Sequence, residues 1–152
     1  MKVVIAGSRT IHHSHPYHRA KLETAIKKFE LEHGKITIVV SGRATGPDLL
    51  GEQWAKDNRA HVAEFPAMWD LHGKASGIVR NVEMADFADG GIVLWDGVSR
   101  GTKHMLKQLK ERHMPYILDI FEPMVYKTTT HLPSGQIVSN TLTKFLDDPA
   151  YD

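Results

Sequence analysis

The residues with the clearest chemical potential lie between Arg80 and Met105, around a short apolar run. Gly91–Trp95 has the composition of a parallel strand buried on both faces. The loop after it, Asp96–Thr102, contains two glycines and leads into a segment with helical apolar spacing. A glycine-rich turn between a strand and a helix exposes backbone N–H groups at the positive end of the helix dipole. This arrangement favours binding of a phosphate or another anion.

Two further loops have a similar position in the pattern. Gly7-Ser8-Arg9 follows an apolar run at the start of the chain, and Ser41-Gly42-Arg43 follows a β-branched run. In an open parallel sheet, ligands bind outside the carboxyl ends of the strands, where the strand order reverses. Each loop taken alone has an alternative interpretation, in which its glycine only permits a tight turn or close helix packing. Convergence of the three loops favours a ligand pocket.

The elements that would position these loops alternate along the chain. Predicted helices begin before Leu22 and at Pro47, and Pro66–Gly77 is a long connection of the kind that is often functional. Alternation of strands and helices predicts an α/β fold with a parallel sheet and right-handed crossovers. The predicted strands are Lys2–Ala6, Ile36–Val40, Ala60–Phe65, Gly91–Trp95 and Ile117–Ile120.

The end of the chain departs from this alternation. Val125–Thr130 and Gln136–Ser139 flank Leu132–Gly135, which predicts a β-hairpin around a Pro/Gly turn. The pattern leaves open whether this hairpin packs on the domain or on a neighbouring subunit. We therefore expect a domain over residues 1–121 and an extension over residues 122–152, in the same globule.

The amino-acid composition excludes several classes of function. The chain has 152 residues, 41% of them hydrophobic, a formal net charge of +1 and no cysteine. Disulfides, thiolate metal sites and cysteine nucleophiles are therefore excluded. The near-neutral charge gives no basic field for nucleic acid or a membrane surface. The first apolar run is too short for a signal peptide and nothing reaches the length of a membrane span, so we expect a cytoplasmic protein without membrane attachment.

Two arginines and two hydroxyl side chains are candidates for holding an anion. Arg80 could bind a phosphate bidentately, or it could form an ion pair on a solvated helix face with Asp86 or Glu83. Arg9 has the same two interpretations. Ser99 and Thr102 could donate to an anion or satisfy backbone groups at a helix start; the pattern does not decide between them. 

Three side chains are candidates for acid–base chemistry. Asp48 and Glu52 lie one helical turn apart and could bind ribose hydroxyls or transfer protons, although this spacing is more typical of a solvated helix start. His104 lies one turn into the helix after the glycine loop and could instead face solvent. Trp69, with Lys74 nearby, could stack on a base, although packing in the core or a lid is the commoner role of tryptophan.

The run from His12 to His18 contains four histidines, and imidazole suits zinc, nickel or copper. It has no obvious carboxylate partner and lies in a predicted loop, whereas a metal site needs fixed geometry. We therefore predict neither a metal nor a cofactor.

Four segments together carry a resemblance to a known family: GSR, SGRATGPD, FPAMWDLHGKASGIVRNVEM and WDGVSRGTKHM. In their order and spacing they resemble the YspA-like, cpYpsA-related branch of the SLOG superfamily over about residues 1–120. The resemblance implies a Rossmann-like, doubly wound parallel sheet of about five strands, here with a C-terminal hairpin extension. It also implies a nucleotide-derived ligand, and a homodimer or larger homo-oligomer. Characterised relatives include phosphoribohydrolases of the LOG type and the single-strand DNA-binding protein DprA, so the fold does not fix the substrate.

The chain departs from the LOG-type catalytic motifs. Arg80-Asn81-Val82-Glu83-Met84 keeps the arginine of R-K-x-x-M but places Asn81 where the lysine would be. In the G-G-x-G-T-x-x-E motif, Met105 occupies the place of the catalytic glutamate. A thioether neither protonates a leaving group nor stabilises an oxocarbenium ion as a carboxylate does. Hydrolysis by the usual pair is therefore not expected, and Arg43 also replaces an expected glycine.

Three functions stay open at this point. The first is binding of a nucleotide-derived phosphorylated molecule by a sensor or sequestering protein. The second is hydrolysis of an N-glycosidic or phosphate-ester bond by Asp48, Glu52 or His104, and the third is single-strand DNA binding, against which the net charge counts. The expected ligand-binding residues are Gly7, Ser8, Arg9, Ser41, Gly42, Arg43, Asp48, Trp69, Lys74, Arg80, Asn81, Asp96, Gly97, Ser99, Arg100, Gly101 and Thr102.

Overall fold

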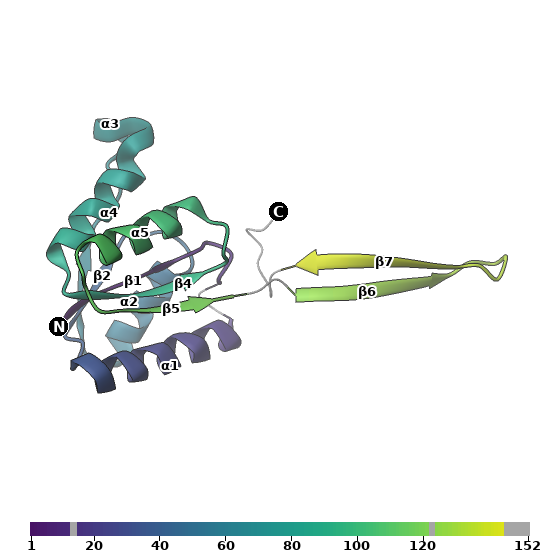
Figure 1. The fold of residues 1–152 in the computed structure, drawn as a ribbon, viewed down its shortest axis with the longest axis horizontal. Helices are drawn as coiled ribbons and strands as arrows, with labels where there is room; N and C mark the ends of the chain where they lie inside the picture. Colours follow the sequence, from purple (N-terminus) through teal and green to yellow (C-terminus); the bar gives the residue numbers. More distant parts are fainter. Residues whose placement is uncertain (13–14, 122–123, 145–152) are drawn as a thin grey trace.

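The computed structural model describes residues 1–12, 15–121 and 124–144, and it confirms the predicted α/β architecture. Five parallel strands form one sheet in the order β3-β2-β1-β4-β5 (Figure 1). Their bounds are β1 Lys2–Gly7, β2 Ile38–Ser41, β3 His61–Glu64, β4 Gly90–Trp95 and β5 Tyr116–Ile120. The chain moves from β1 outward to β3 and then crosses back to β4, so the strand order reverses between β1 and β4.

Helices cover both faces of the sheet, as in a doubly wound fold (Figure 1). Alternate β1 residues point to opposite faces, so Val3 and Ile5 lie in one apolar core and Val4 and Ala6 in the other. The first core is closed by α1 (Pro16–His33) and α2 (Pro47–Asp57). The second is closed by α4 (Ser76–Phe87) and α5 (Arg100–Glu111).

The second strand begins two residues later than the sequence predicts. Ile36 is buried, but its backbone N–H donates to the Glu30 carboxylate at 2.8 Å, away from the strand ladder. The ladder with β1 starts only where Ile38 lies opposite Lys2. The prediction from apolar residues alone therefore began this strand two residues too early and omitted its last residue, Ser41.

The prediction of a long loop over Pro66–Gly77 is wrong in part. The segment contains one helical turn, α3 (Trp69–His72), and a 3₁₀ turn over Gly73–Ala75, and α4 already begins at Ser76. The Ser76 hydroxyl donates to the Gly73 carbonyl at 2.5 Å and so links the 3₁₀ turn to the start of α4. Short turns of this kind lack the apolar periodicity by which longer helices are recognised.

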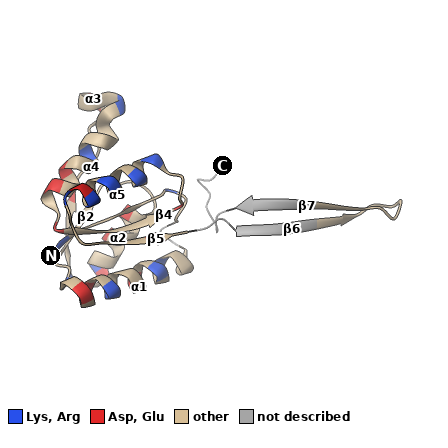
Figure 2. Ribbon diagram, in the orientation of Figure 1, with Lys and Arg blue, Asp and Glu red and all other residues tan. Residues whose placement is uncertain are grey.

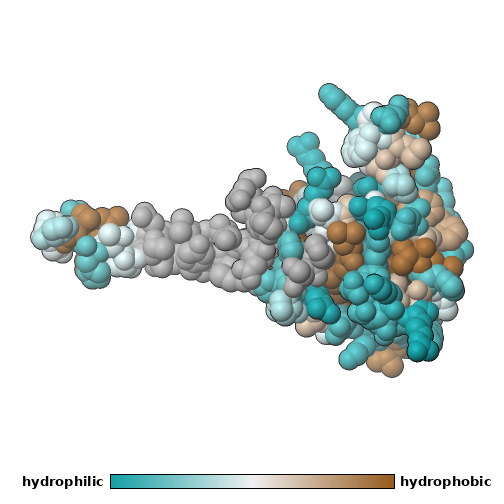
Figure 3. Space-filling model, turned by 180° about the vertical axis from the view of Figure 1, so that it is seen from behind, coloured by the Kyte–Doolittle hydropathy of each residue, from teal (hydrophilic) through white to brown (hydrophobic). Residues whose placement is uncertain are grey.

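The predicted hairpin is confirmed as a second, two-stranded sheet. Strands β6 (Met124–His131) and β7 (Ile137–Lys144) pair antiparallel, and Gly135 occupies the turn with a φ of +86°. The hairpin projects from the sheet domain (Figure 1), and apolar side chains gather at its tip (Figure 3). Leu132, Ile137 and Val138 are the exposed apolar residues there.

Charges of both signs are interspersed over the helices that surround the sheet (Figure 2). No helix in the part of the chain that the structure describes combines the length and apolarity needed to cross a bilayer.

Close packing of α2 on β1 depends on a glycine. A Cβ added to Gly51 would lie 2.8 Å from Cβ of Ile5, closer than real Cβ contacts. We expect Gly51→Ala to destabilise the protein by about 1–2 kcal/mol, because overpacking costs about 1–3 kcal/mol and alanine's helix propensity returns up to about 1. The measurement is the free energy of unfolding in urea.

The matched control is Gly77→Ala in α4, where an added Cβ meets nothing within 4 Å. This variant should gain the higher helix propensity of alanine without a steric clash, and its midpoint of urea unfolding should equal or exceed that of the wild type. Equal stability of the two variants would contradict the close approach of α2 to the sheet.

Candidate functional site

A cavity of about 380 Å³ opens at the carboxyl ends of β1 and β4, where the strand order reverses. This is the position at which open α/β sheets bind ligands, and the volume is within the usual range for small-molecule sites. Residues of β1, α2, α4, α5 and the intervening loops line it: Ala6, Gly7, Arg9, Thr10, Ala44, Asp48, Arg80, Asn81, Met84, Asp96, Ser99, Gly101, Thr102 and Met105.

The ends of β1 and β4 are joined at Gly7 and Ser8. The Ser8 backbone N–H donates to the Leu94 carbonyl at 3.0 Å, and its hydroxyl accepts from the Asp96 N–H at the same distance. A Cβ at Gly7 would lie 2.0 Å from the Leu94 oxygen, so no other residue fits there without a shift of the backbone. Ser8 is buried behind the cavity wall and positions the loop after β4.

Asp96 shapes the loop after β4. Its Oδ1 accepts from the N–H groups of Val98 and Ser99 at 2.9 and 2.8 Å, and its Oδ2 accepts from the Thr10 hydroxyl at 3.0 Å. Burial acts to raise the pKa of Asp96, but these hydrogen bonds outweigh it and hold the pKa below its usual value. Asp96 is therefore an anion that organises the loop.

The first turn of α5 borders the cavity through Ser99, Gly101 and Thr102. The Ser99 and Thr102 hydroxyls lie 3.1 Å apart, and Thr102 is also 3.5 Å from the Ser8 hydroxyl. In the first turn of a helix the backbone N–H groups have no partner within the helix and carry the positive end of its dipole. This turn can accept an anionic group.

Arg80 reaches the cavity from α4. Its Nη1 donates to the Gly42 carbonyl at 3.1 Å, while its buried Nε has no hydrogen-bond partner among the described residues. The alternative ion pair with Asp86 is not formed, because Asp86 pairs with Arg112 at 2.8 Å. A buried donor without an acceptor is costly, so an acceptor supplied by a ligand would relieve it.

Asp48 lies in the first turn of α2 and is buried. Its Oδ2 accepts from the Ala44 N–H at 3.2 Å. Burial raises the pKa of Asp48 to about 6, although the hydrogen bond from Ala44 and the positive charge of Arg80 act in the opposite direction. The cavity thus contains a carboxyl group that can gain or lose a proton near neutral pH.

Ser41, Arg43 and Glu52 form a network outside the cavity lining. The Ser41 hydroxyl donates to Glu52 Oε2 at 2.6 Å, and the Arg43 guanidinium binds Oε1 of the same carboxylate. Arg43 also lies 3.6 Å from Glu64. Glu52 therefore lies outside the cavity lining that contains Asp48, although its negative charge contributes to the raised pKa of Asp48.

Asn81 lines the cavity, whereas His104 lies behind it. The Asn81 amide nitrogen is 3.1 Å from the Gly101 carbonyl and 3.2 Å from His104 Nδ1. Burial and the positive charge of Lys107 lower the pKa of His104, so its imidazole is neutral at pH 7.

The remaining predicted residues are away from the cavity lining. Trp69, Lys74, Gly97 and Arg100 are exposed, the first two on the turns that precede α4. The backbone of Gly42 contributes by accepting from Arg80.

Sequence reasoning missed five residues of the lining: Ala6, Thr10, Ala44, Met84 and Met105. Met84 and Met105 are buried and form an apolar part of the wall. Thr10 follows the GSR segment directly, and Ala44 lies inside SGRATGPD, so membership of these two loops was the available signal.

In the histidine segment, His15 caps the start of α1 and His18 lies in the first turn of that helix. His18 is buried, lies edge-on to Phe121 with ring centroids 5.3 Å apart, and its Nδ1 accepts from the His12 N–H at 2.9 Å. His13 and Ser14 lie outside the described residues. Among the residues that are described, no three His, Asp or Glu side chains gather closely enough to hold a metal ion.

Comparison with known proteins agrees with this geometry. A family described as YspA, cpYpsA-related SLOG matches residues 1–72. The chain is 33% identical over 86 residues to the Gene 61 protein of Mycobacterium phage D29, an alignment that covers 53% of this chain and 69% of the phage protein. No solved structure matches the chain. With the Rossmann-like sheet described above, these matches show that the chain belongs to the YspA, cpYpsA-related SLOG family.

Proposed function

We propose that the protein binds a nucleotide-derived phosphorylated small molecule in this cavity, as a sensor or sequestering protein. The observation that carries the proposal is the buried, unpartnered Nε of Arg80, in a residue that shares the cavity with the first turn of α5. A guanidinium and free backbone N–H groups are both suited to phosphate oxygens. Family membership supports a nucleotide-related ligand.

The wall between these polar groups supports binding of the rest of such a ligand. Met84 and Met105 offer apolar surface, and Asp48 offers a carboxylate or carboxyl to hydroxyl groups such as those of ribose. The thioether of Met105 can transfer no proton, which favours binding over LOG-type hydrolysis.

A second candidate function is hydrolysis of an N-glycosidic or phosphate-ester bond in the same class of ligand. Asp48 favours it, because a buried carboxyl with a pKa of about 6 can serve as a general acid near neutral pH. DNA binding has less support, since the formal net charge is only +1 and residues of both charges are interspersed along the helices in Figure 2. The homo-oligomer and the cytoplasmic location stay predictions.

The function is tested by thermal-shift screening against nucleotides, cyclic nucleotides, NAD and ADP-ribose derivatives, followed by native mass spectrometry. At about 100 times Kd, a ligand of the folded state should stabilise it by about 2.7 kcal/mol. Recovery of the ligand intact supports sensing or sequestration, and recovery of cleaved products supports the hydrolase. Absence of stabilisation by the whole panel would contradict both.

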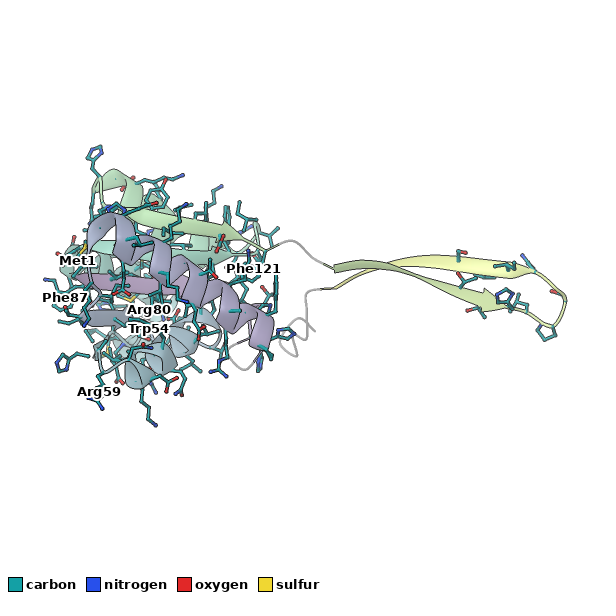
Figure 4. All side chains as sticks on the ribbon, turned by 90° about the horizontal axis from the view of Figure 1, so that it is seen from below. Met1, Trp54, Arg59, Arg80, Phe87 and Phe121 are labelled. Carbon is teal, nitrogen blue, oxygen red and sulfur yellow. The ribbon has the colours of Figure 1, made fainter. Side chains whose placement is uncertain are left out.

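Arg80→Ala should weaken binding of a phosphorylated ligand found in this screen by about 1.5–3 kcal/mol, or about 10- to 150-fold in Kd, because it removes a charged hydrogen bond. Isothermal titration calorimetry measures the change. Arg59→Ala is the matched control, since Arg59 is exposed and points outward from the domain, whereas Arg80 lies within it (Figure 4). Equal affinity of the two variants would place the anion elsewhere.

Asp48→Asn should stabilise the protein in a pH-dependent way. The folded pKa of about 6 lies above the ordinary value of 3.8, so ionisation of Asp48 costs stability as the pH rises through this interval. The cost reaches about 3 kcal/mol above pH 6, and the variant avoids it. The difference in unfolding free energy between Asp48→Asn and the wild type should therefore be greater at pH 8 than at pH 4.

Urea unfolding of both proteins at the two pH values measures this difference. Asp57→Asn is the control, because Asp57 is an exposed residue of the same helix and the substitution makes the same chemical change outside the cavity. A difference that shrinks between pH 4 and pH 8 would show that Asp48 is stabilised as an anion in the folded protein.

A further inference from the structure

Asn81 connects the two helices that border the cavity. It belongs to α4, next to Arg80, and its side-chain nitrogen lies 3.1 Å from the carbonyl oxygen of Gly101 in the first turn of α5. A carbonyl oxygen only accepts, so the Asn81 amide must direct its N–H₂ group, and not its oxygen, toward Gly101. One hydrogen of the amide is used in this contact.

The second hydrogen has an acceptor in His104. Nδ1 of this residue lies 3.2 Å from the same Asn81 nitrogen, and a neutral imidazole accepts at its unprotonated nitrogen. With both amide hydrogens occupied, the Asn81 oxygen is the group left for the cavity, which Asn81 lines. His104 itself lies outside the lining and acts through Asn81.

The far side of His104 must rearrange to suit this arrangement. An imidazole that accepts at Nδ1 carries its hydrogen on Nε2, 3.2 Å from the Gln108 side-chain nitrogen, which is also a donor. Rotating the Gln108 amide by 180° presents its oxygen to the Nε2 hydrogen but turns its N–H₂ group toward Arg112 Nη1, which now donates to that oxygen at 2.6 Å. The rotation therefore costs this hydrogen bond and requires the Arg112 side chain to shift, while Arg112 keeps the Asp86 carboxylate as a partner.

We propose that His104 is a positioning residue, which holds Asn81 with its carbonyl oxygen toward the cavity and so selects a ligand with a hydrogen-bond donor beside its anionic group. The selection of a ligand rests on the proposed function. The orientation of Asn81 does not, because it follows from contacts within the protein. The donor belongs to the class of amino and hydroxyl groups that a nucleotide carries on its base and ribose.

Protonation of His104 would break the arrangement. An imidazolium donates at both nitrogens, so its Nδ1 hydrogen would face the Asn81 N–H₂ group. The charged groups that act on His104 are Lys107 and Glu111 of its own helix and Arg112, the residue after that helix, which is paired with Asp86 of α4. Affinity that depends on the Asn81 orientation should therefore fall as His104 becomes protonated in acid.

The orientation is tested without a ligand. In the ¹⁵N-labelled full-length protein at pH 8, ring nitrogen shifts of His104 should report hydrogen on Nε2 and a lone pair on Nδ1. A hydrogen on Nδ1 would overturn the proposal, whatever the protein binds.

The selection is tested by calorimetry with AMP and with inorganic phosphate, which has no base or ribose donor. His104→Leu should raise the Kd for AMP about tenfold, the scale of one lost hydrogen bond, and leave the Kd for phosphate within about twofold. His104→Asn places an acceptor near the position of Nδ1 and should retain AMP affinity. His33→Leu, at the end of α1, is the control and should change neither value.

The pH profile distinguishes positioning from a general structural role. Asp48 and the AMP phosphate titrate in both the wild type and His104→Asn. A loss of AMP affinity at acidic pH that is seen only in the wild type is therefore caused by protonation of His104.

Two results would overturn the proposal: equal AMP affinity of His104→Leu and the wild type, or a loss of phosphate affinity in His104→Leu as large as its loss of AMP affinity. Wild-type protein with the Nε2 hydrogen but without affinity for any probe would overturn the proposed function and the ligand selection, while supporting the Asn81 orientation.

Discussion

The contact between the ends of β1 and β4 is the constraint on which the site depends. The two strands are parallel neighbours, yet the chain leaves them toward helices on opposite faces of the sheet. The Ser8 N–H and hydroxyl tie the ends together through Leu94 and Asp96, and Gly7 makes the approach sterically feasible. Because both ends are fixed, the loops that diverge from them enclose a cavity and do not collapse onto each other.

The cavity concentrates polar groups that are unfavourable to the isolated folded chain. Asp48 is buried with a raised pKa, and the buried Nε of Arg80 has no acceptor among the described residues. Both features oppose stability, whereas the apolar cores on either side of the sheet supply it. Concentration of this cost at one place is typical of a site that is completed by a ligand.

The sequence was informative where one physical signal dominated. Apolar runs located all five parallel strands, and glycine-containing loops located the strand ends that border the cavity. Sequence patterns led to wrong predictions where contacts between different segments of the chain determine the structure. The Ile36 N–H donates to the Glu30 carboxylate and not to the β2 ladder, and Glu52 binds Ser41 and Arg43 outside the cavity lining. The role of Asn81 was equally hidden, because its partners Gly101 and His104 lie on a different helix.

The strand order also has a consequence for synthesis of the chain. Residues 1–72, the segment that the family match covers, contain β1, β2 and β3 but neither β4 nor the helices of the second core. While a ribosome extends the chain through this segment, one edge of β1 lacks its neighbour β4, and the apolar face of Val4, Ala6 and Val40 lacks the residues of α4, β4 and α5 that complete its core. Release of residues 90–109 supplies β4 and the apolar residues of α5. The central strand of the sheet is thus the first to be made and among the last to be enclosed.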